Sequence, residues 1–250
     1  MRRSQTLLYS TLVLTVLLSG CGRKAHEETE AEALAKYGQQ ASALREALRQ
    51  VASLLPARVN PKERPPLAKL DPPMCLAFGD SQNAHVVSEP QLTNLEAPPE
   101  LAAWWSDNLI MFLQWMDSLA RRPSANLHGS PEYSDARSEN FLATKYLVVI
   151  RTVEFTPPKA VNPDDLKAGY TRGEAALDAF VVNLASSQVL AAFRVSAVTD
   201  KEISFEHSKS DSASDTVKGM EDEARDSLLK NVRVNVEKVL EDQLGAQVTK

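Results

Sequence analysis

Two segments on either side of Ser186 and Ser187 constrain the fold of this chain more than any other part of the sequence. Each carries apolar residues on one face and a more mixed set on the other. This pattern is typical of an antiparallel β-hairpin. With a two-residue turn, the predicted cross-strand pairs are Phe180–Phe193, Val182–Ala191, Leu184–Val189 and, at the strand end, Asp178–Val195. A shift of one residue would separate the two phenylalanines, so the register is a specific prediction.

The remaining elements follow from periodicity and from the positions of proline and glycine. The expected strands are 74–78, 84–88 and 146–155, with 203–205 as an extension of the same sheet. The expected helices are 27–55, 98–121 and a final helix that ends near Leu244 and is capped by Ser212, Ser214 or Asp215. The expected exposed loops are 122–140, 157–172 and 206–215.

These elements predict an α+β fold. We expect a small antiparallel or mixed sheet with helices packed on one face, preceded by an N-terminal amphipathic helix. In that helix, apolar residues recur at alternating spacings of three and four from Leu34 to Leu55, which is a heptad stripe. Two interpretations stay open: a helix that lies on its own domain, or a self-associating coiled-coil stalk.

The first 20 residues have the features of an export signal. Arg2 and Arg3 form a basic start, and the stretch from Leu7 to Leu18 is nearly all apolar. As a helix that stretch reaches about 18 Å, whereas a bilayer core is about 30 Å thick. The length therefore argues against a permanent transmembrane helix. A twin-arginine signal has weak support, because it rests on a bare arginine pair.

The run Leu18-Ser19-Gly20-Cys21 resembles the lipobox of bacterial lipoprotein signals. The resemblance implies cleavage before Cys21, attachment of acyl chains to Cys21, and a protein anchored in the cell envelope through a lipid in the membrane. A signal peptide without lipidation is the alternative. Gly22 stands where an aspartate would retain an enteric-type lipoprotein on the inner membrane, so the expected location is the outer membrane, facing the periplasm.

The expected division of the chain has four parts. They are a signal peptide at 1–20, a lipid anchor and amphipathic helix at 21–55, a proline-rich connector at 56–73 and an α+β domain at 74–250. The formal charge of the chain is −5 and falls to −7 when the two signal arginines are removed. Because nucleic-acid binding needs a basic surface, we expect no nucleic-acid partner.

Residues that carry chemistry are sparse. Cys21 is assigned to the lipid, and Cys75 lies in an apolar run that predicts a buried thiol. His26, His85, His128 and His207 lie in polar or loop-like segments without the spacing of a metal site. The acidic groups 164–165 and 221–223 are expected to face solvent. We therefore predict no catalytic, metal or cofactor site, and no enzyme activity.

The order strand, hairpin and long helix over 145–244 loosely resembles the small periplasmic modules of envelope-assembly lipoproteins, such as the penicillin-binding-protein activators and the curli-secretion lipoprotein. The expectation is a non-enzymatic module that binds an envelope protein. One alternative is a carrier or sensor of an apolar ligand, suggested by Trp104, Trp105 and Trp115. The other is a hydrolase with an unrecognised site.

Overall fold

The computed structural model describes residues 5–59, 70–76, 82–98, 101, 108–121, 135–162, 169–204 and 212–248, and for 5–29 it describes the backbone alone. The helices are α1 (Gln5–Leu54), α2 (Glu89–Thr93), α3 (Asn108–Arg121), α4 (Asp135–Leu142) and α5 (Ala213–Leu244). The strands are β1 (Ala84–Ser88), β2 (Tyr146–Thr156), β3 (Lys159–Ala160), β4 (Tyr170–Thr171), β5 (Glu174–Asn183) and β6 (Gln188–Val198).

The main sheet has four strands in the order β1-β2-β5-β6. β1 runs parallel to β2, and the β2–β5 and β5–β6 pairs are antiparallel. The predicted α+β class, the mixed sheet and the N-terminal helix are confirmed. Strands β3 and β4 form a separate two-stranded ribbon within the segment that was expected to be a loop.

Helices cover both faces of this sheet, whereas one covered face was expected. On one face, α5 packs against β5 and β6, and alternate residues of all four strands, among them Val148, Val181 and Val195, belong to the same apolar core. On the other face, α1 to α4 form a helical layer over Val87, Val149 and Phe180. The central strand β5 is buried along nearly its whole length, because both of its faces are covered.

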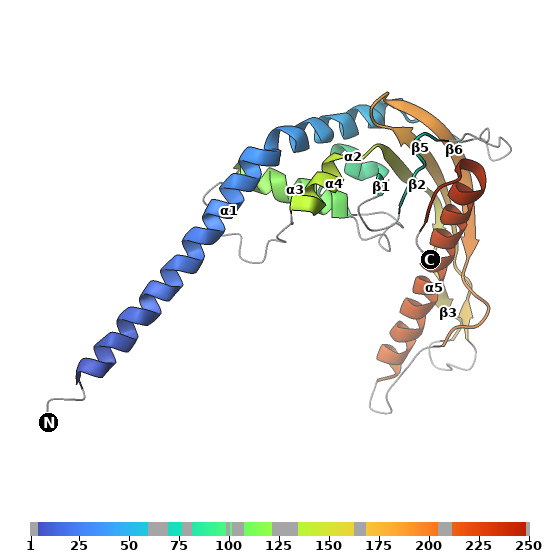
Figure 1. Cartoon of the computed structure of the whole chain (residues 1–250). Helices are drawn as coiled ribbons and strands as arrows, with labels where there is room; N and C mark the ends of the chain where they lie inside the picture. The colour runs from blue at the N-terminus through green and yellow to red at the C-terminus, as the bar shows by residue number, and fades with distance from the viewer. Residues whose placement is uncertain are drawn as a thin grey trace.

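Helix α1 is continuous from Gln5 to Leu54, and its N-terminal part extends away from the rest of the molecule (Figure 1). From Leu34 onward, its heptad stripe packs inside the chain: Tyr37, Ala41, Leu48 and Val51 are buried in the helical layer. The stripe therefore lies on its own domain over these residues. The helix ends two residues before Pro56, which is consistent with the effect of proline on helix geometry.

The hairpin β5–β6 is present, but the predicted register is wrong: it is displaced by one residue as far as Val181, which pairs with Ala191, and by two residues at Val182, which pairs with Val189. The loop spans four residues, 184–187, and Ser187 has a positive φ of 50°. Phe193 therefore pairs with Ala179 and lies on the α5 side, whereas Phe180 lies under the helical layer. Both faces of β5 are buried, so alternation along this strand does not select one register over the other.

The observed register also provides a partner for a buried charge. Asp178 is almost fully buried and pairs across the sheet with Arg194, whose Nε donates to its Oδ1 at 2.8 Å. In the predicted register Asp178 would have faced Val195. A buried carboxylate without a partner is strongly unfavourable, so this ion pair supports the observed register.

Helix α4 lies within 122–140, where an exposed loop was expected, and that prediction is wrong from Asp135 onward. Phe141 and Ser138 of α4 are buried. Asp135 accepts hydrogen bonds from Lys36 Nζ at 2.9 Å and Tyr37 Oη at 2.8 Å, which lower the pKa of its carboxyl. These contacts with α1 stabilise a helix whose own sequence is mostly polar. Residues 122–134 lie outside the described residues.

Helix α5 and the C-terminal segment close the other side of the molecule. The Ser212 hydroxyl caps α5 by accepting from the Asp215 N–H, and Gly245, with φ 62°, ends it in the left-handed conformation. Residues 246–248 then lie beside 74–76, where Gln247 N donates to Met74 O at 2.8 Å and Leu76 N donates to Gln247 O at 2.9 Å. Of the expected strand at 74–78, the described part thus forms an isolated bridge at Cys75.

Arg151 of β2 joins three elements at the border of the helical layer. It forms a two-pronged ion pair with Glu89 at the start of α2, with distances of 2.5 and 2.7 Å. Its Nη1 donates to the carbonyls of Pro56 and Ala57, just after α1, and its guanidinium lies over the ring of Phe180. The ends of α1 and α2 are therefore positioned against the sheet by one side chain.

Within the described part of the chain, no helix combines the length and the apolar character that crossing a membrane requires.

Candidate functional site

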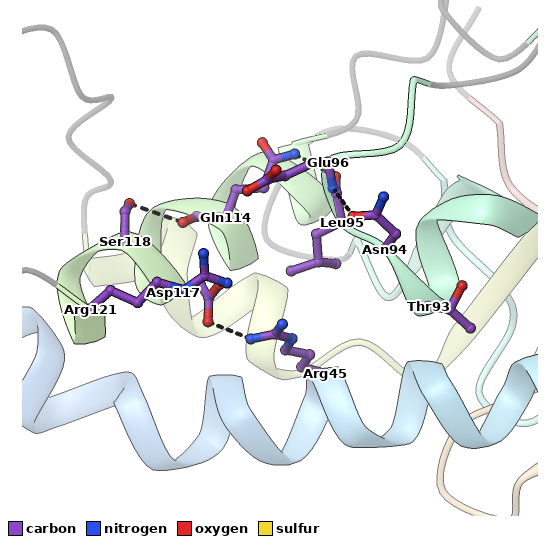
Figure 2. Close-up of a pocket in the computed structure, with 9 residues that line it drawn as sticks. All are labelled: Arg45, Thr93, Asn94, Leu95, Glu96, Gln114, Asp117, Ser118 and Arg121. Carbon is purple, nitrogen blue, oxygen red and sulfur yellow. Dashed lines mark hydrogen bonds and ion pairs between the residues drawn. The ribbon is translucent and has the colours of Figure 1, made fainter.

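A polar pocket lies in the helical layer between α1, α3 and the segment after α2 (Figure 2). Its volume is about 370 Å³. The residues that line it are Arg45, Thr93, Asn94, Leu95, Glu96, Gln114, Asp117, Ser118 and Arg121. Most of these side chains are polar, so the pocket suits a ligand that forms hydrogen bonds and ion pairs. We call it the Asp117 pocket.

Asp117 is at the centre of one wall. Arg45 of α1 contacts its Oδ1 through Nη1, and Arg121, one turn further along α3, contacts its Oδ2 through Nη2 at 2.5 Å. The Asp117 side chain is 22% exposed, so the three charges lie at the surface of the pocket rather than in the core. Each guanidinium has five N–H donors, so most of these donors are available to a ligand.

Helix α3 positions this wall by its periodicity. Gln114, Asp117, Ser118 and Arg121 follow one another at spacings of three, one and three, which places them on one face of the helix. The opposite face is apolar and buried, with Phe112, Trp115 and Leu119 in the core of the helical layer. The core contacts thus fix the rotation of α3, and the polar face turns toward the pocket.

The other wall is the segment that follows α2. Gln91 accepts a hydrogen bond from the Ser88 N–H at 3.0 Å, which fixes the start of α2. After the helix, Asn94 Oδ1 accepts from the Glu96 N–H at 3.1 Å, and Gln114 Nε2 donates to the Leu95 carbonyl at 2.5 Å. These bonds tie the segment to α3 and leave the Glu96 carboxylate exposed at the pocket.

The charges of the lining balance. Arg45 and Arg121 are matched by Asp117 and Glu96, so the lining has no net formal charge. Both arginines, however, contact Asp117, whereas Glu96 has no ion-pair partner among the residues that the structure describes. The pocket therefore has a cationic wall and a separate anionic point.

A second, narrower groove lies on the other side of the Arg45–Asp117 pair. It has a volume of about 100 Å³ and runs between α1 and α3, where Gly38, Ala41, Leu113 and Met116 make its walls mostly apolar. The ion pair thus separates a polar pocket from an apolar groove.

His85 lies in β1, within the strand expected at 84–88, but it is buried under the helical layer and not in the polar surroundings that were expected for the histidines. It is buried, and its ring packs against Phe141 with a centroid distance of 5.5 Å. Burial lowers its pKa to about 4. Its Nδ1 lies 3.5 Å from Gln82 Nε2, and its Nε2 has no hydrogen-bond partner among the described residues. The ring is therefore neutral at pH 7 and forms part of the core.

The structure distributes the other residues considered in the sequence analysis as follows. Cys21 lies within α1, but its side chain, like that of His26, is outside the described residues. Cys75 is buried, as predicted, and Trp115 belongs to the core. In the acidic group 221–223, Asp222 and Glu223 are exposed, whereas Glu221 accepts a hydrogen bond from the Ala160 N–H. His128, His207, Trp104, Trp105 and 164–165 lie outside the described residues.

Sequence reasoning missed the Asp117 pocket because its charges come from three separate segments. Asp117 and Arg121 are four apart on a helix, a spacing that usually indicates a solvent-exposed ion pair. Nothing in the sequence brings Arg45 or Glu96 to the same place. The sequence feature that could have indicated the pocket was the polar face of α3, which lies opposite an unusually wide apolar face.

Among the residues that the structure places, no three His, Cys, Asp or Glu side chains form a group that could hold a metal ion. Comparison with protein-family models found no match, and comparison with curated proteins found none either.

Proposed function

We propose that this protein is a lipid-anchored lipoprotein of the cell envelope that binds a partner protein through the Asp117 pocket, without catalysing a reaction. One observation carries the proposal: α1 contains both Cys21, the proposed acylated residue, and Arg45, which lines the pocket. Anchor and pocket would therefore be joined by a single helix.

The helix sets the distance between the two. The residues from Cys21 to Arg45 span about 36 Å at about 1.5 Å per residue. The headgroup layer of a bilayer is about 5–8 Å thick. If α1 stands upright on the membrane, the pocket lies well beyond the headgroups, where an envelope protein can reach it.

Packing supports a fixed orientation of the pocket relative to α1. The helix is embedded in the helical layer from Leu34 onward, and its contacts include the buried Tyr37, Leu48 and Val51. The connection between anchor and body is then a rigid helix rather than a flexible linker. The Gly22 position favours the outer membrane, facing the periplasm, and the net charge of −5 argues against a nucleic-acid partner.

The anchor is tested with the Cys21→Ser variant in cells of the source organism. We expect mass spectrometry to find acyl chains on the unaltered chain and none on the variant. In cell fractionation, the unaltered chain should be found with the membranes and the variant should not. A variant that remains membrane-bound without acyl chains would contradict lipid anchoring through Cys21.

The partner is tested by placing a photo-crosslinking amino acid at Thr93 or Ser118, both at the pocket, and at Val234 on the exposed face of α5. Irradiation of intact cells is expected to capture the same envelope protein from Thr93 and Ser118 and not from Val234. Capture of that protein from Val234 alone, or of no protein from the two pocket positions, would overturn the proposal.

A further inference from the structure

We infer that the Asp117 pocket recognises a peptide segment that carries opposite charges, with a carboxylate bound at Arg45 and Arg121 and an ammonium group bound at Glu96. The inference rests on the proposed function in one respect, because it describes the segment through which a partner protein would enter this pocket. It adds the chemical character of that segment, which follows from the charges of the lining.

The cationic wall accounts for the carboxylate. Two guanidinium groups share the single carboxylate of Asp117, so this wall has one positive charge in excess. The Arg121 side chain is 62% exposed at the end of α3 and can therefore turn toward a ligand without disturbing the core. Guanidinium groups bind carboxylates through paired hydrogen bonds, and a second carboxylate would balance the excess charge.

Glu96 accounts for the ammonium group. Its backbone is fixed by the bond from its N–H to Asn94 and by the neighbouring bond from Gln114 to the Leu95 carbonyl. Its carboxylate is exposed and has no cation within ion-pair distance in the described ranges. A lysine ammonium is a compact point charge that suits a single exposed carboxylate.

The charge balance excludes a ligand with several negative charges. Asp117 and Glu96 together cancel Arg45 and Arg121, so a phosphate or nucleotide would meet two carboxylates in the same lining. A segment with one carboxylate and one ammonium group forms a favourable ion pair at each wall and adds no net charge to the pocket. The pocket volume of about 370 Å³ lies near the lower end of the range for ligand sites, which suits a few residues of a peptide.

The test uses the full chain in detergent and three five-residue peptides with blocked ends, measured by isothermal titration calorimetry. One peptide contains Glu and Lys, one contains Gln and Lys, and one contains Glu and Gln. Exposed ion pairs are weak, so we expect the Glu–Lys peptide to bind about three- to fivefold more tightly than either of the others. Inorganic phosphate is the anionic control.

Two variants assign each charge to its wall. In Glu96→Gln, the Glu–Lys and Glu–Gln peptides should bind equally, and in Arg121→Gln, the Glu–Lys and Gln–Lys peptides should bind equally. Both side chains are exposed, so both variants are expected to fold. Glu223→Gln and Arg225→Gln, at exposed positions of α5, are the matched controls and should keep the full preference.

Equal binding of the three peptides, tighter binding of phosphate, or no saturable binding would each overturn the inference. These outcomes are distinct from failure of the proposed function. If the peptides do not bind but the crosslinker at Thr93 and Ser118 captures one envelope protein, the proposed function stands and the charge pattern is wrong. If the peptides bind as expected and no protein is captured, the pocket chemistry stands and the partner protein is wrong.

Discussion

The two faces of the sheet are covered in different ways. On one face, a single long helix, α5, packs a continuous apolar stripe that includes Leu228, Val232 and Val236. On the other face, four helices from scattered segments form the helical layer, and ion pairs join them to one another and to the sheet: Lys36–Asp135, Arg45–Asp117 and Glu89–Arg151.

This difference separates stability from recognition. The α5 face depends mainly on apolar burial, which has no directional requirement, and its polar contacts with the sheet, such as the bonds that Asn231 and Asn235 donate to carbonyls of β6, lie at the exposed edge. The helical layer depends in part on polar contacts, and where its helices do not meet completely it leaves the Asp117 pocket. Substitutions on the two faces should therefore differ in size, in pH dependence and in their effect on binding.

The largest effect is expected for Leu228→Ala on the α5 face. Leu228 is fully buried, so the truncation leaves a cavity and should lower the free energy of unfolding by about 2–5 kcal/mol. Urea unfolding measures the change. Val234→Ala, on the exposed side of the same helix, is the control and should change it by less than about 0.5 kcal/mol. Equal losses in the two variants would mean that α5 does not pack as described.

Arg194→Met, on the face of the sheet that the helical layer covers, should be nearly as destabilising as Leu228→Ala. It removes the partner of the buried Asp178 carboxylate. We expect a loss of about 3 kcal/mol, at the low end for a buried pair, because Arg194 is 27% exposed and solvent reaches the pair. Urea unfolding of Arg194→Met and of Asp178→Asn/Arg194→Met measures it, and the double variant should recover part of the loss. No loss in the single variant would contradict the observed register.

The pH dependence should come from the helical layer through His85. Its pKa of about 4 lies below the ordinary value of 6.5, so the unfolded chain binds the proton first as the pH falls. Stability is therefore lost as the pH falls from 6.5 toward 4, by about 2 kcal/mol between pH 6.5 and 5. Urea unfolding at several pH values should show this loss in the natural chain, beyond the loss that remains in His85→Leu. Identical pH profiles would exclude His85 as the source.

The smallest effect concerns coupling between the faces. Phe180→Leu and Phe193→Leu should each cost about 1–2 kcal/mol, and because the two rings lie on opposite sides of the sheet their costs should add to within about 0.5 kcal/mol. A double-mutant cycle by urea unfolding measures this. A coupling clearly above that value would indicate the direct Phe180–Phe193 contact of the predicted register.

The sequence predicted the helices whose burial follows one periodicity: the stripe of α5 and the stripe of α1 from Leu34 were recognisable, because a helix with one buried side shows it in its spacing. The cap of α5, Ser212, was one of three candidates. The strand from Tyr146 was recognisable as a continuous apolar run, because its first five residues are buried on both faces. The hairpin register was not, because both faces of β5 are buried and alternation carries no information there. The choice between registers depended on Asp178 and Arg194, which pair across the sheet.

Tertiary contacts account for the other differences. Helix α4 is mostly polar, and the residues that bond to it, Lys36 and Tyr37, are about a hundred residues earlier in the sequence. The pocket likewise combines Arg45, Glu96 and Asp117, which belong to three separate segments of the sequence. Single charged residues on a periodic helix usually indicate a solvated face, and local reasoning cannot show which of them meet.

The contact between residues 74–76 and 246–248 has a consequence for the order of folding. It joins the segment before β1 to the segment after α5. The fold is therefore complete only when the long loop between residues 76 and 246 has closed. Closing a long loop is slow, because its entropic cost precedes the gain from the contact. A chain delivered N-terminus first, from a ribosome or through a membrane pore, cannot form this contact until residue 248 is free. During delivery, residues 74–76 therefore lack their contact with 246–248, and their backbone groups are exposed to other proteins until the C-terminal segment arrives.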